Sequence, residues 1–240
     1  MSTPKQQRHA ARTSVILIAN DVTPVGDLLW ASLRGRPLLA WTVDAFSQDV
    51  GIAHIALVVA PERLAEAESL RAAEGWGHSE VIAAEDGRLA ALRAGLTALG
   101  AHCALVIVHD GARPLVTQAI IAAGLAVAHN HPDAVAVATE PVKETLKHVQ
   151  GERVIETLPR ERLARAQTPF VFRRADLERA LALAQAAGAP DDELALARAA
   201  GLPLIAYSGS HANLLATTKS DLPILAALLD GRMTSGTDTA

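Results

Sequence analysis

The chain contains very few cysteine and aromatic residues for its length. Its 240 residues include one cysteine, three tryptophans, three phenylalanines and one tyrosine. The single cysteine, Cys103, excludes an internal disulfide framework and predicts a reducing compartment, the cytoplasm. Because aromatic residues make up only 3% of the chain, the core must be built from Ala, Leu, Val and Ile.

The chain also lacks an excess of positive charge and a long apolar run. Its formal net charge is −4 and its pI is near 6.1, which argues against nucleic acid as a partner. No apolar run is long enough for a membrane span, so we expect no membrane partner. Residues 1–12 are basic but lack the apolar stretch of a secretory signal, and residues 233–240 are rich in Thr, Ser and Gly. We expect both segments to be disordered tails that flank a single domain over residues 13–232.

Apolar runs typical of buried strands alternate along the chain with stretches of helical periodicity. The expected strands are Ser14–Ala19, Ile52–Ala60, Val81–Ala84, Leu105–His109, Ala134–Ala138 and Leu204–Tyr207. The expected helices are Pro37–Phe46, Pro61–Glu74, Arg88–Leu99, Gln118–His129, Arg174–Ala187, Asp192–Ala200 and a last helix from Ser220 to about Asp230. This alternation predicts an α/β fold with an open, doubly wound, mostly parallel sheet that helices cover on both faces.

The alternation breaks between about residues 140 and 165. Two polar, extended stretches flank Gln150-Gly151, which is typical of a hairpin with too little apolar content for a core. One interpretation is an arm that projects from the domain and needs a partner surface, which favours a homodimer. The other is a solvent-exposed hairpin at the edge of the main sheet.

The segment with the clearest chemical pattern is the apolar run Leu105–His109, which ends at Asp110 and is followed by Gly111, Arg113 and Pro114. Ligands of open α/β sheets bind at the carboxyl ends of the strands. A carboxylate there suits Mg²⁺, and a neighbouring arginine suits phosphate. An ordinary strand-to-helix turn, with Asp as turn former and Pro as breaker, is the alternative interpretation.

Other chemically suggestive residues have simpler interpretations. His129 and His131 lack a cysteine or carboxylate at ligand spacing, so a solvated helix end is favoured over a metal site. Alternation along the strand directs His109 away from Asp110 and into the packing of the sheet. The cluster Asp191-Asp192-Glu193 is typical of a helix N-terminus, where the dipole favours acidic residues.

Taken in order, several segments resemble the 2-C-methyl-D-erythritol 4-phosphate cytidylyltransferase family over about residues 14–230. The central match is Val108–Pro114. The other matching segments are Gly35–Leu39, Asp86–Arg88, Ala94–Leu96, Pro141–Lys147, Arg160, Ala166–Pro169, Pro190–Asp192, Asn213, Thr217 and Ser220–Leu222.

The resemblance implies a Rossmann-like nucleotidyltransferase fold and a homodimer joined by the β-arm. It also implies transfer of CMP from CTP to 2-C-methyl-D-erythritol 4-phosphate, with Mg²⁺, in non-mevalonate isoprenoid biosynthesis. The implied catalytic residues are Asp110, Arg113 and Arg160, and Asp110 is also the implied metal ligand. The implied nucleotide-binding residues are Ala19, Asp86, Arg88 and Gly111, and the implied substrate-binding residues are Thr145, Arg160 and Thr168.

The chain departs from this family in the first strand-to-helix turn, Ala19–Leu28. The family has a glycine-rich turn with basic residues there, whose backbone and cations hold the triphosphate. Here the turn has one glycine, is about three residues shorter, and carries two carboxylates, Asp21 and Asp27. No Arg or Lys lies between Thr13 and Leu33, so a replacement cation would have to come from Arg12, Arg34 or Arg36.

Two further departures affect the base pocket and the acceptor site. Ala84-Glu85 and Ala91 stand where the family has Gly-Gly and a serine that read cytosine, and Leu215 stands where it has a lysine near the substrate phosphate. Three functions therefore remain open. The first is the family's cytidylyl transfer, with impaired activity. The second is a catalytically inactive homologue that binds a sugar phosphate or acts as a structural or regulatory partner. The third is a nucleotidyltransferase for another polyol phosphate.

Overall fold

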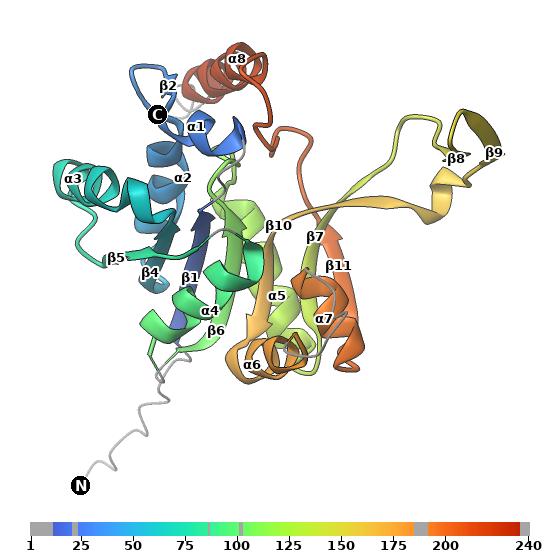
Figure 1. The fold of residues 1–240 in the computed structure, drawn as a ribbon, viewed down its shortest axis with the longest axis horizontal. Helices are drawn as coiled ribbons and strands as arrows, with labels where there is room; N and C mark the ends of the chain where they lie inside the picture. The colour runs from blue at the N-terminus through green and yellow to red at the C-terminus, as the bar shows by residue number, and fades with distance from the viewer. Residues whose placement is uncertain (1–11, 21–23, 86, 101–102, 185–191, 236–240) are drawn as a thin grey trace, which may run out of the picture.

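The centre of the molecule is a seven-stranded sheet, whose strands lie side by side across Figure 1. The computed structural model describes residues 12–20, 24–85, 87–100, 103–184 and 192–235. The strands of the central sheet are β1 (Arg12–Ala19), β4 (Ile52–Val59), β5 (Ser79–Ala83), β6 (Cys103–Asp110), β7 (Val135–Pro141), β10 (Ala164–Arg173) and β11 (Leu204–Ser208). Their spatial order is β11-β7-β10-β6-β1-β4-β5, and every neighbouring pair is parallel except the two pairs that β10 makes. The predicted α/β class and the mostly parallel sheet are therefore confirmed.

Strand β10 is the one element of the central sheet that the sequence did not predict. It lies antiparallel between β6 and β7, and its pairing with β7 shifts register between Gln167 and Phe170. Pro169 falls at this shift, where a residue without an N–H interrupts the ladder. The polar first half of the strand and its proline hide a buried second half, Phe170–Phe172, from an analysis based on periodicity.

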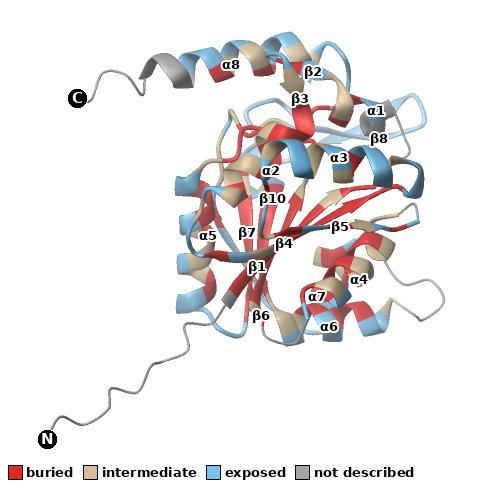
Figure 2. Cartoon of the chain, turned by 90° about the vertical axis from the view of Figure 1, so that its left-hand side faces the viewer, coloured by how far each residue is buried: buried red, intermediate tan, exposed pale blue. Residues whose placement is uncertain are grey.

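Helices cover both faces of the sheet (Figure 2). One apolar cluster joins the sheet to α2 (Leu38–Ser47), α3 (Leu64–Glu74), α5 (Gln118–Asn130) and α8 (Asp221–Ser235). The other joins it to α4 (Arg88–Ala98), α6 (Arg174–Leu183) and α7 (Glu193–Ala199). Side chains alternate between the two clusters along each strand, as Val15 and Leu17 against Ile16 show on β1. This two-sided burial explains why the strands are apolar throughout.

Some helix predictions need correction. Helix α1 (Pro24–Trp30) was not predicted, since it is only seven residues long and follows the unusual first turn. Helix α8 continues to Ser235, past the predicted end near Asp230. The short elements η1 (Pro61–Arg63), β2 (Ser32–Leu33) and β3 (Arg36–Pro37) complete the main body. Among the described residues, no helix combines the length and the hydropathy that crossing a membrane requires.

The hairpin around Gly151 forms a two-stranded sheet of its own, made of β8 (Lys147–Gln150) and β9 (Arg153–Thr157) and followed by η2 (Arg160–Arg162). Every residue of β8 and β9 is exposed, and the hairpin projects far from the main body (Figure 1). The predicted projecting hairpin is therefore confirmed, and it is exposed to solvent in this single chain.

The residue before the central aspartate, His109, is fully buried, as predicted from the alternation of β6. Its ring packs at 5.0 Å from the ring of Phe46, and its Nε2 lies 3.2 Å from the Arg113 carbonyl oxygen. Burial lowers the pKa of His109 to about 4. The imidazole is therefore a neutral part of the core.

Lowering the pH is expected to destabilise the fold through His109. An unfolded histidine titrates near pH 6.5, so the unfolded chain takes up this proton first. The stability that neutral His109 contributes is complete above pH 6.5 and is lost as the pH falls towards 4. The difference between the folded and unfolded pKa values of His109 corresponds to a loss of unfolding free energy on the order of 3 kcal/mol. Urea denaturation should be measured between pH 7 and 4 without added divalent metal. The free energy of unfolding should fall more steeply with decreasing pH for the wild type than for His109→Gln. Equal slopes would contradict this account.

Helix α4 approaches β1 closely because residue 95 is glycine. A Cβ on Gly95 would lie 2.7 Å from Cγ2 of Ile16, which is fully buried. We expect Gly95→Ala to destabilise the protein by about 1–3 kcal/mol, since overpacking outweighs the gain in helix propensity. Gly231→Ala is the matched helical control, because a Cβ there meets no atom within 4 Å. Urea denaturation should show a lower free energy of unfolding for Gly95→Ala and an unchanged one for Gly231→Ala. Equal stabilities of the two variants would contradict the close approach of α4 to β1.

Candidate active site

The candidate site begins at the turn that follows β6. Asp110 is the last residue of that strand, and its side chain is 17% exposed. Gly111 then packs directly on β1: its N–H donates to the Ile18 carbonyl at 2.8 Å, and its carbonyl accepts from the Thr42 hydroxyl at 2.7 Å. A Cβ on Gly111 would lie 3.0 Å from the same Ile18 oxygen. The glycine therefore lets the turn sit tightly between β1 and α2.

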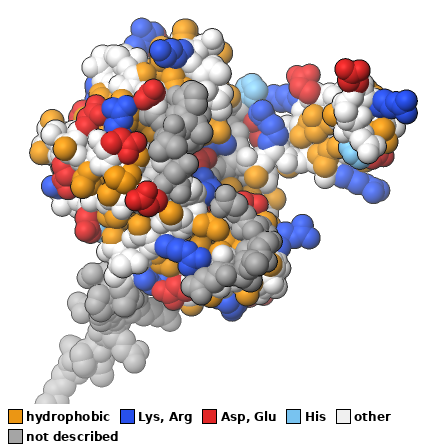
Figure 3. All heavy atoms as spheres, viewed as in Figure 1, with side chains coloured by type: hydrophobic (Ala, Val, Ile, Leu, Met, Phe, Trp, Pro, Cys, Tyr) orange, Lys and Arg blue, Asp and Glu red, His pale blue; other side chains and the backbone are white. Residues whose placement is uncertain are grey.

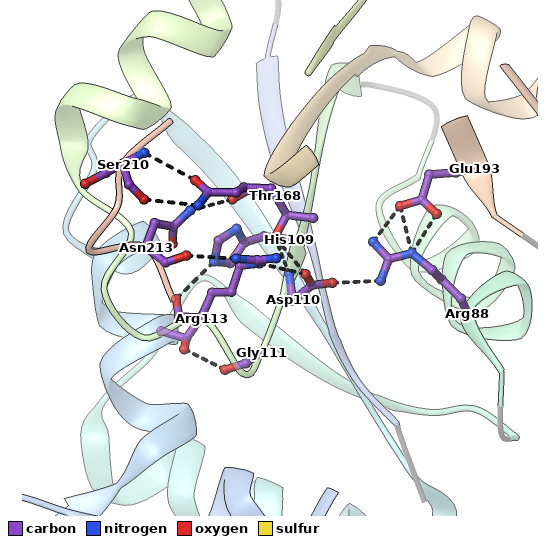
Figure 4. Close-up of polar contacts among 11 residues, drawn as sticks. Arg88, His109, Asp110, Gly111, Arg113, Thr168, Glu193, Ser210 and Asn213 are labelled. Atoms are coloured by element: carbon purple, nitrogen blue, oxygen red, sulfur yellow. Dashed lines mark hydrogen bonds and ion pairs between the residues drawn. The ribbon is translucent and has the colours of Figure 1, made fainter. Parts of the chain in front are cut away.

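Two arginines and a threonine hold the Asp110 carboxylate (Figure 4). Arg88 donates from Nη1 to Oδ1 at 2.7 Å, and Arg113 donates from Nε to Oδ2 at 3.0 Å. The Thr168 hydroxyl donates to Oδ2 at 3.1 Å and accepts the Asp110 N–H at 3.1 Å. Burial alone would raise the pKa of Asp110, but the charges of Arg88 and Arg113 outweigh it and hold that pKa well below its usual range. The carboxylate is therefore ionised across the physiological pH range.

Arg113 links the turn to the segment that follows β11. Its side chain is 11% exposed, and its Nη1 donates to the Asn213 carbonyl at 2.8 Å. The Asn213 side chain is fully buried and donates from Nδ2 to the Thr168 carbonyl at 2.8 Å, whereas its Oδ1 has no hydrogen-bond partner. Strands β6 and β10 and the segment after β11 are thus tied together at one edge of the sheet.

Arg88 links the same carboxylate to α7. At the start of α4, its Nε donates to both carboxylate oxygens of Glu193, at 2.8 and 2.6 Å, and its Nη2 donates to Oε1 at 2.5 Å. Burial alone would lower the pKa of Arg88, but Asp110 and Glu193 outweigh it and raise that pKa, so the guanidinium stays charged. Glu193 itself is 1% exposed.

The structure brings most of the predicted site residues together. Asp110, Gly111, Arg113, Arg88 and Thr168 form one connected cluster, and Ala19, at the end of β1, lies against Gly111.

Two of the predicted residues that the structure describes are not part of this cluster. Thr145 and Arg160 lie on the arm, where Arg160 donates to the Lys143 carbonyl at 2.7 Å and lies near Glu161. Asp86 lies outside the described residues.

Sequence reasoning missed Glu193 and Gln167 as members of the site and gave Asn213 no role. Glu193 follows Asp192, which caps α7 by accepting the N–H groups of Leu194 and Ala195, so the sequence favours a helix start for the acidic cluster, while the family resemblance implies a substrate-side aspartate near this position. The sequence does hold one signal for Glu193: a helix needs one N-cap residue, and Asp192 already serves as that cap, so a second acidic residue beside it suggests another role. Gln167 lies in the segment Ala166–Pro169 that resembles the family, but the resemblance implies no role for it.

A pocket of about 180 Å³ lies beside Arg113. Its lining residues are Arg113, Arg165, Ala166, Gln167, Asn213, Leu214 and Leu215. Two guanidinium groups and two amides in one small pocket suit an anion with hydroxyl groups nearby. A second pocket, of about 300 Å³, lies at the base of the arm between Lys143, Leu146, Arg165 and His211.

The site offers a magnesium ion one carboxylate, that of Asp110. No group of three or more His, Cys, Asp or Glu side chains that could hold a metal occurs among the described residues. Mg²⁺ usually takes one or two protein carboxylates and completes its shell with substrate phosphates and water. Asp110 is partly exposed and ionised, and Oδ1 accepts one hydrogen bond, from Arg88. Oδ1 keeps a second lone pair, but the positive charge of Arg88 beside it repels a cation, so Asp110 suits such a shared metal once Arg88 moves away.

The comparisons with known proteins agree with this geometry. The sequence matches the model of the 2-C-methyl-D-erythritol 4-phosphate cytidylyltransferase family over residues 26–231. A protein of that name from Dehalococcoides mccartyi is 37% identical over 222 residues, which are 90% of this chain and 95% of that protein. Another, from Cereibacter sphaeroides, is 38% identical over 213 residues, covering 87% of this chain and 92% of that protein.

Solved structures give the same result. The 2-C-methyl-D-erythritol 4-phosphate cytidylyltransferase of Thermus thermophilus superposes with a TM-score of 0.72 at 29% identity, covering 90% of this chain and 98% of that one. The fold alone is also shared with the 4-diphosphocytidyl-2C-methyl-D-erythritol synthase of Anaerococcus prevotii, with a TM-score of 0.80 at 21% identity, covering 91% and 98% of the two chains. The chain belongs to the 2-C-methyl-D-erythritol 4-phosphate cytidylyltransferase family.

Proposed function

We propose that this protein transfers the cytidylyl group of CTP to 2-C-methyl-D-erythritol 4-phosphate and releases pyrophosphate. The observation that carries the proposal is the ionised Asp110, held between Arg88 and Arg113 at the carboxyl edge of β6 in a chain of this family. The related proteins bear the name of this activity, and the single buried Cys103 agrees with a reducing compartment such as the cytoplasm.

The reaction needs positioning and charge neutralisation more than covalent chemistry. An oxygen of the acceptor phosphate forms a bond to the α-phosphorus of CTP, the bond between that phosphorus and the bridging oxygen breaks, and pyrophosphate leaves with the electron pair. Arg88 and Arg113 flank Asp110 and place two fixed positive charges where negative charge gathers. Mg²⁺ bound by Asp110 and the triphosphate would supply further neutralisation.

The acceptor phosphate fits best in the pocket beside Arg113. Leu215 contributes no charge to this pocket, but the guanidinium groups of Arg113 and Arg165 both line it. Arg165 is held by Glu140 at 2.5 Å and its side chain is 57% exposed, so it remains accessible to an anion. Arg165 therefore brings a cation to the pocket where the family carries one at the position of Leu215, and Glu140 offsets part of its charge.

The triphosphate side is the weak part of the site. The nearby cations already have carboxylate partners: Arg63 pairs with Asp27 at 2.8 Å, Arg36 with Asp44 and Glu74, and Arg34 with Asp230. Asp21 lies outside the described residues. This shortage of cations predicts weak binding of CTP, and it is the observation that favours a sugar-phosphate-binding homologue without catalysis as the second candidate function.

The arm supports a homodimer. Strand β7 runs parallel to β6, and β10 antiparallel to both, so the arm leaves the sheet at the edge where Asp110 lies. The arm exposes Val149, Val154 and Ile155, each more than half accessible, between charged side chains (Figure 3). An exposed apolar hairpin of this kind gains stability by packing on another surface. We propose that two copies exchange arms, which brings Thr145 and Arg160 to the partner's site.

Turnover is the direct test of the proposed function. The wild type, given CTP, Mg²⁺ and 2-C-methyl-D-erythritol 4-phosphate, should release pyrophosphate, and ³¹P NMR should show the new diphosphate linkage. Asp110→Asn should reduce kcat/KM about 100- to 1,000-fold, since it removes the charge that orients both arginines.

Asp176→Asn is the matched control for this experiment. Asp176 lies on α6, which follows the carboxyl end of β10 at the opposite edge of the sheet, and it pairs with Arg179 at 3.1 Å. The control should retain wild-type turnover. A folded wild type that neither turns over nor binds millimolar CTP would reject the proposal in favour of the inactive homologue.

Arm exchange predicts complementation between two inactive variants. Asp110→Asn and Arg160→Gln homodimers should each be inactive, because each lacks one component of every site. A heterodimer of the two, purified through different tags, should regain about half the wild-type activity, since one of its two sites is complete. Arg162→Gln, on the same short helix η2, is the control and should remain active as a homodimer. A silent heterodimer would show that Arg160 does not serve the partner's site.

A further inference from the structure

Glu193 is a buried carboxylate with a partner in the candidate site but no role in the proposed chemistry. It is the first residue of α7, it is 1% exposed, and it accepts three hydrogen bonds from Arg88 at 2.5–2.8 Å. Its neighbour Asp192 already caps α7, so the helix does not require a second acidic side chain there. Burying a carboxylate is costly unless a charge compensates it, and Arg88 supplies that charge.

Arg88 uses separate nitrogens for its two acidic partners. Nε and Nη2 face Glu193, and Nη1 faces Asp110 at 2.7 Å (Figure 4). The contact with Glu193 is the more buried of the two, since the Asp110 side chain is 17% exposed and that of Glu193 is 1% exposed. Arg88 can therefore release Asp110 while Glu193 still holds its position and compensates part of its charge.

This division matters because Arg88 occupies the same oxygen that a metal would need. A guanidinium at 2.7 Å from Oδ1 competes with a divalent cation for that oxygen and repels it. Glu193 offsets this competition by sharing the positive charge of Arg88. Without the Glu193 carboxylate, the positive charge of Arg88 would be compensated by Asp110 alone, and the competition would increase.

We propose that Glu193 is a positioning residue that holds Arg88 so that Asp110 can exchange the guanidinium for a divalent cation. The Nη1 group released in this exchange is then directed towards an anion bound beside the metal. The use of that metal in catalysis rests on the proposed function, but the exchange at Asp110 is a property of these three side chains.

Binding of Mn²⁺ alone tests the exchange without turnover. The free Mn²⁺ signal in electron paramagnetic resonance would be titrated against wild type, Glu193→Gln, Asp192→Asn and Asp110→Asn. The Kd should rise about tenfold for Glu193→Gln and change less than twofold for Asp192→Asn, which loses the same charge one residue away. Asp110→Asn should abolish the site. A wild type without Asp110-dependent binding, or equal Kd values for Glu193→Gln and the wild type, would overturn the proposal.

A double-mutant cycle separates positioning from simple charge attraction. If Glu193 acts through Arg88, Glu193→Gln should change the Kd less than twofold in an Arg88→Gln background. An equal rise in both backgrounds would overturn the proposal, because it would mean that the Glu193 charge attracts the metal directly. Glu193→Asp, which keeps the charge on a shorter side chain, replaces Glu193→Gln if the latter does not fold.

Turnover measured on the same variants distinguishes this proposal from the proposed function. If the Mn²⁺ pattern holds but the wild type does not turn over, the cytidylyl-transfer function fails and the role of Glu193 stands. If the wild type turns over but the Mn²⁺ pattern is absent, the cytidylyl-transfer function stands and the proposed role of Glu193 fails.

Discussion

The Asp110 carboxylate, compensated by Arg88 and Arg113, is the interaction on which the rest of the site depends. A largely buried charge is stable only if its partners are themselves held in place. Arg88 is held by Glu193 and Arg113 by the Asn213 carbonyl. The start of α4, the start of α7 and the segment after β11 therefore converge on the end of β6. These segments are far apart in the sequence, and this network joins them at one edge of the sheet.

The antiparallel strand β10 gives the arm its functional position. Because β10 lies between β6 and β7 and runs against both, the chain leaves β7 and returns into β10 at the same edge as Asp110. The hydroxyl of Thr168 on β10 reaches Asp110, so the root of the arm touches the site directly. The arm's own tip extends away from the main body (Figure 1). In the proposed exchange of arms, Thr145 and Arg160 of a second copy would complete the site, which is why we link dimerisation to activity.

The two halves of the site differ in how well their charges suit an anionic substrate. On the acceptor side, Arg113 and Arg165 line a pocket that Leu215 leaves without a lysine. On the triphosphate side, Asp27 uses Arg63, and the first turn contributes no cation of its own. The side chains that hold Asp110 come from α4, the turn after β6 and β10, with α7 holding Arg88, and Asn20 of the first turn supports the start of α4 by donating to the carbonyls of Glu85 and Gly87. Because these contacts use no cation of the first turn, loss of CTP affinity and preservation of the fold are compatible in this chain.

By itself the sequence determined the fold class, the position of the arm and the strand end that carries Asp110. These features follow from local patterns: alternation of apolar runs with helical periodicity, a polar hairpin, and an apolar run that stops at a carboxylate. The sequence pattern does not predict strand β10, because its polar half and Pro169 break the apolar run that marks the other strands. Only the tertiary structure decided that Glu193 faces Arg88, 105 positions away in the sequence, and that Arg165 lines the pocket beside Arg113. A pairing of charges across that separation leaves no periodic signal, because the packing of α7 against the sheet creates it.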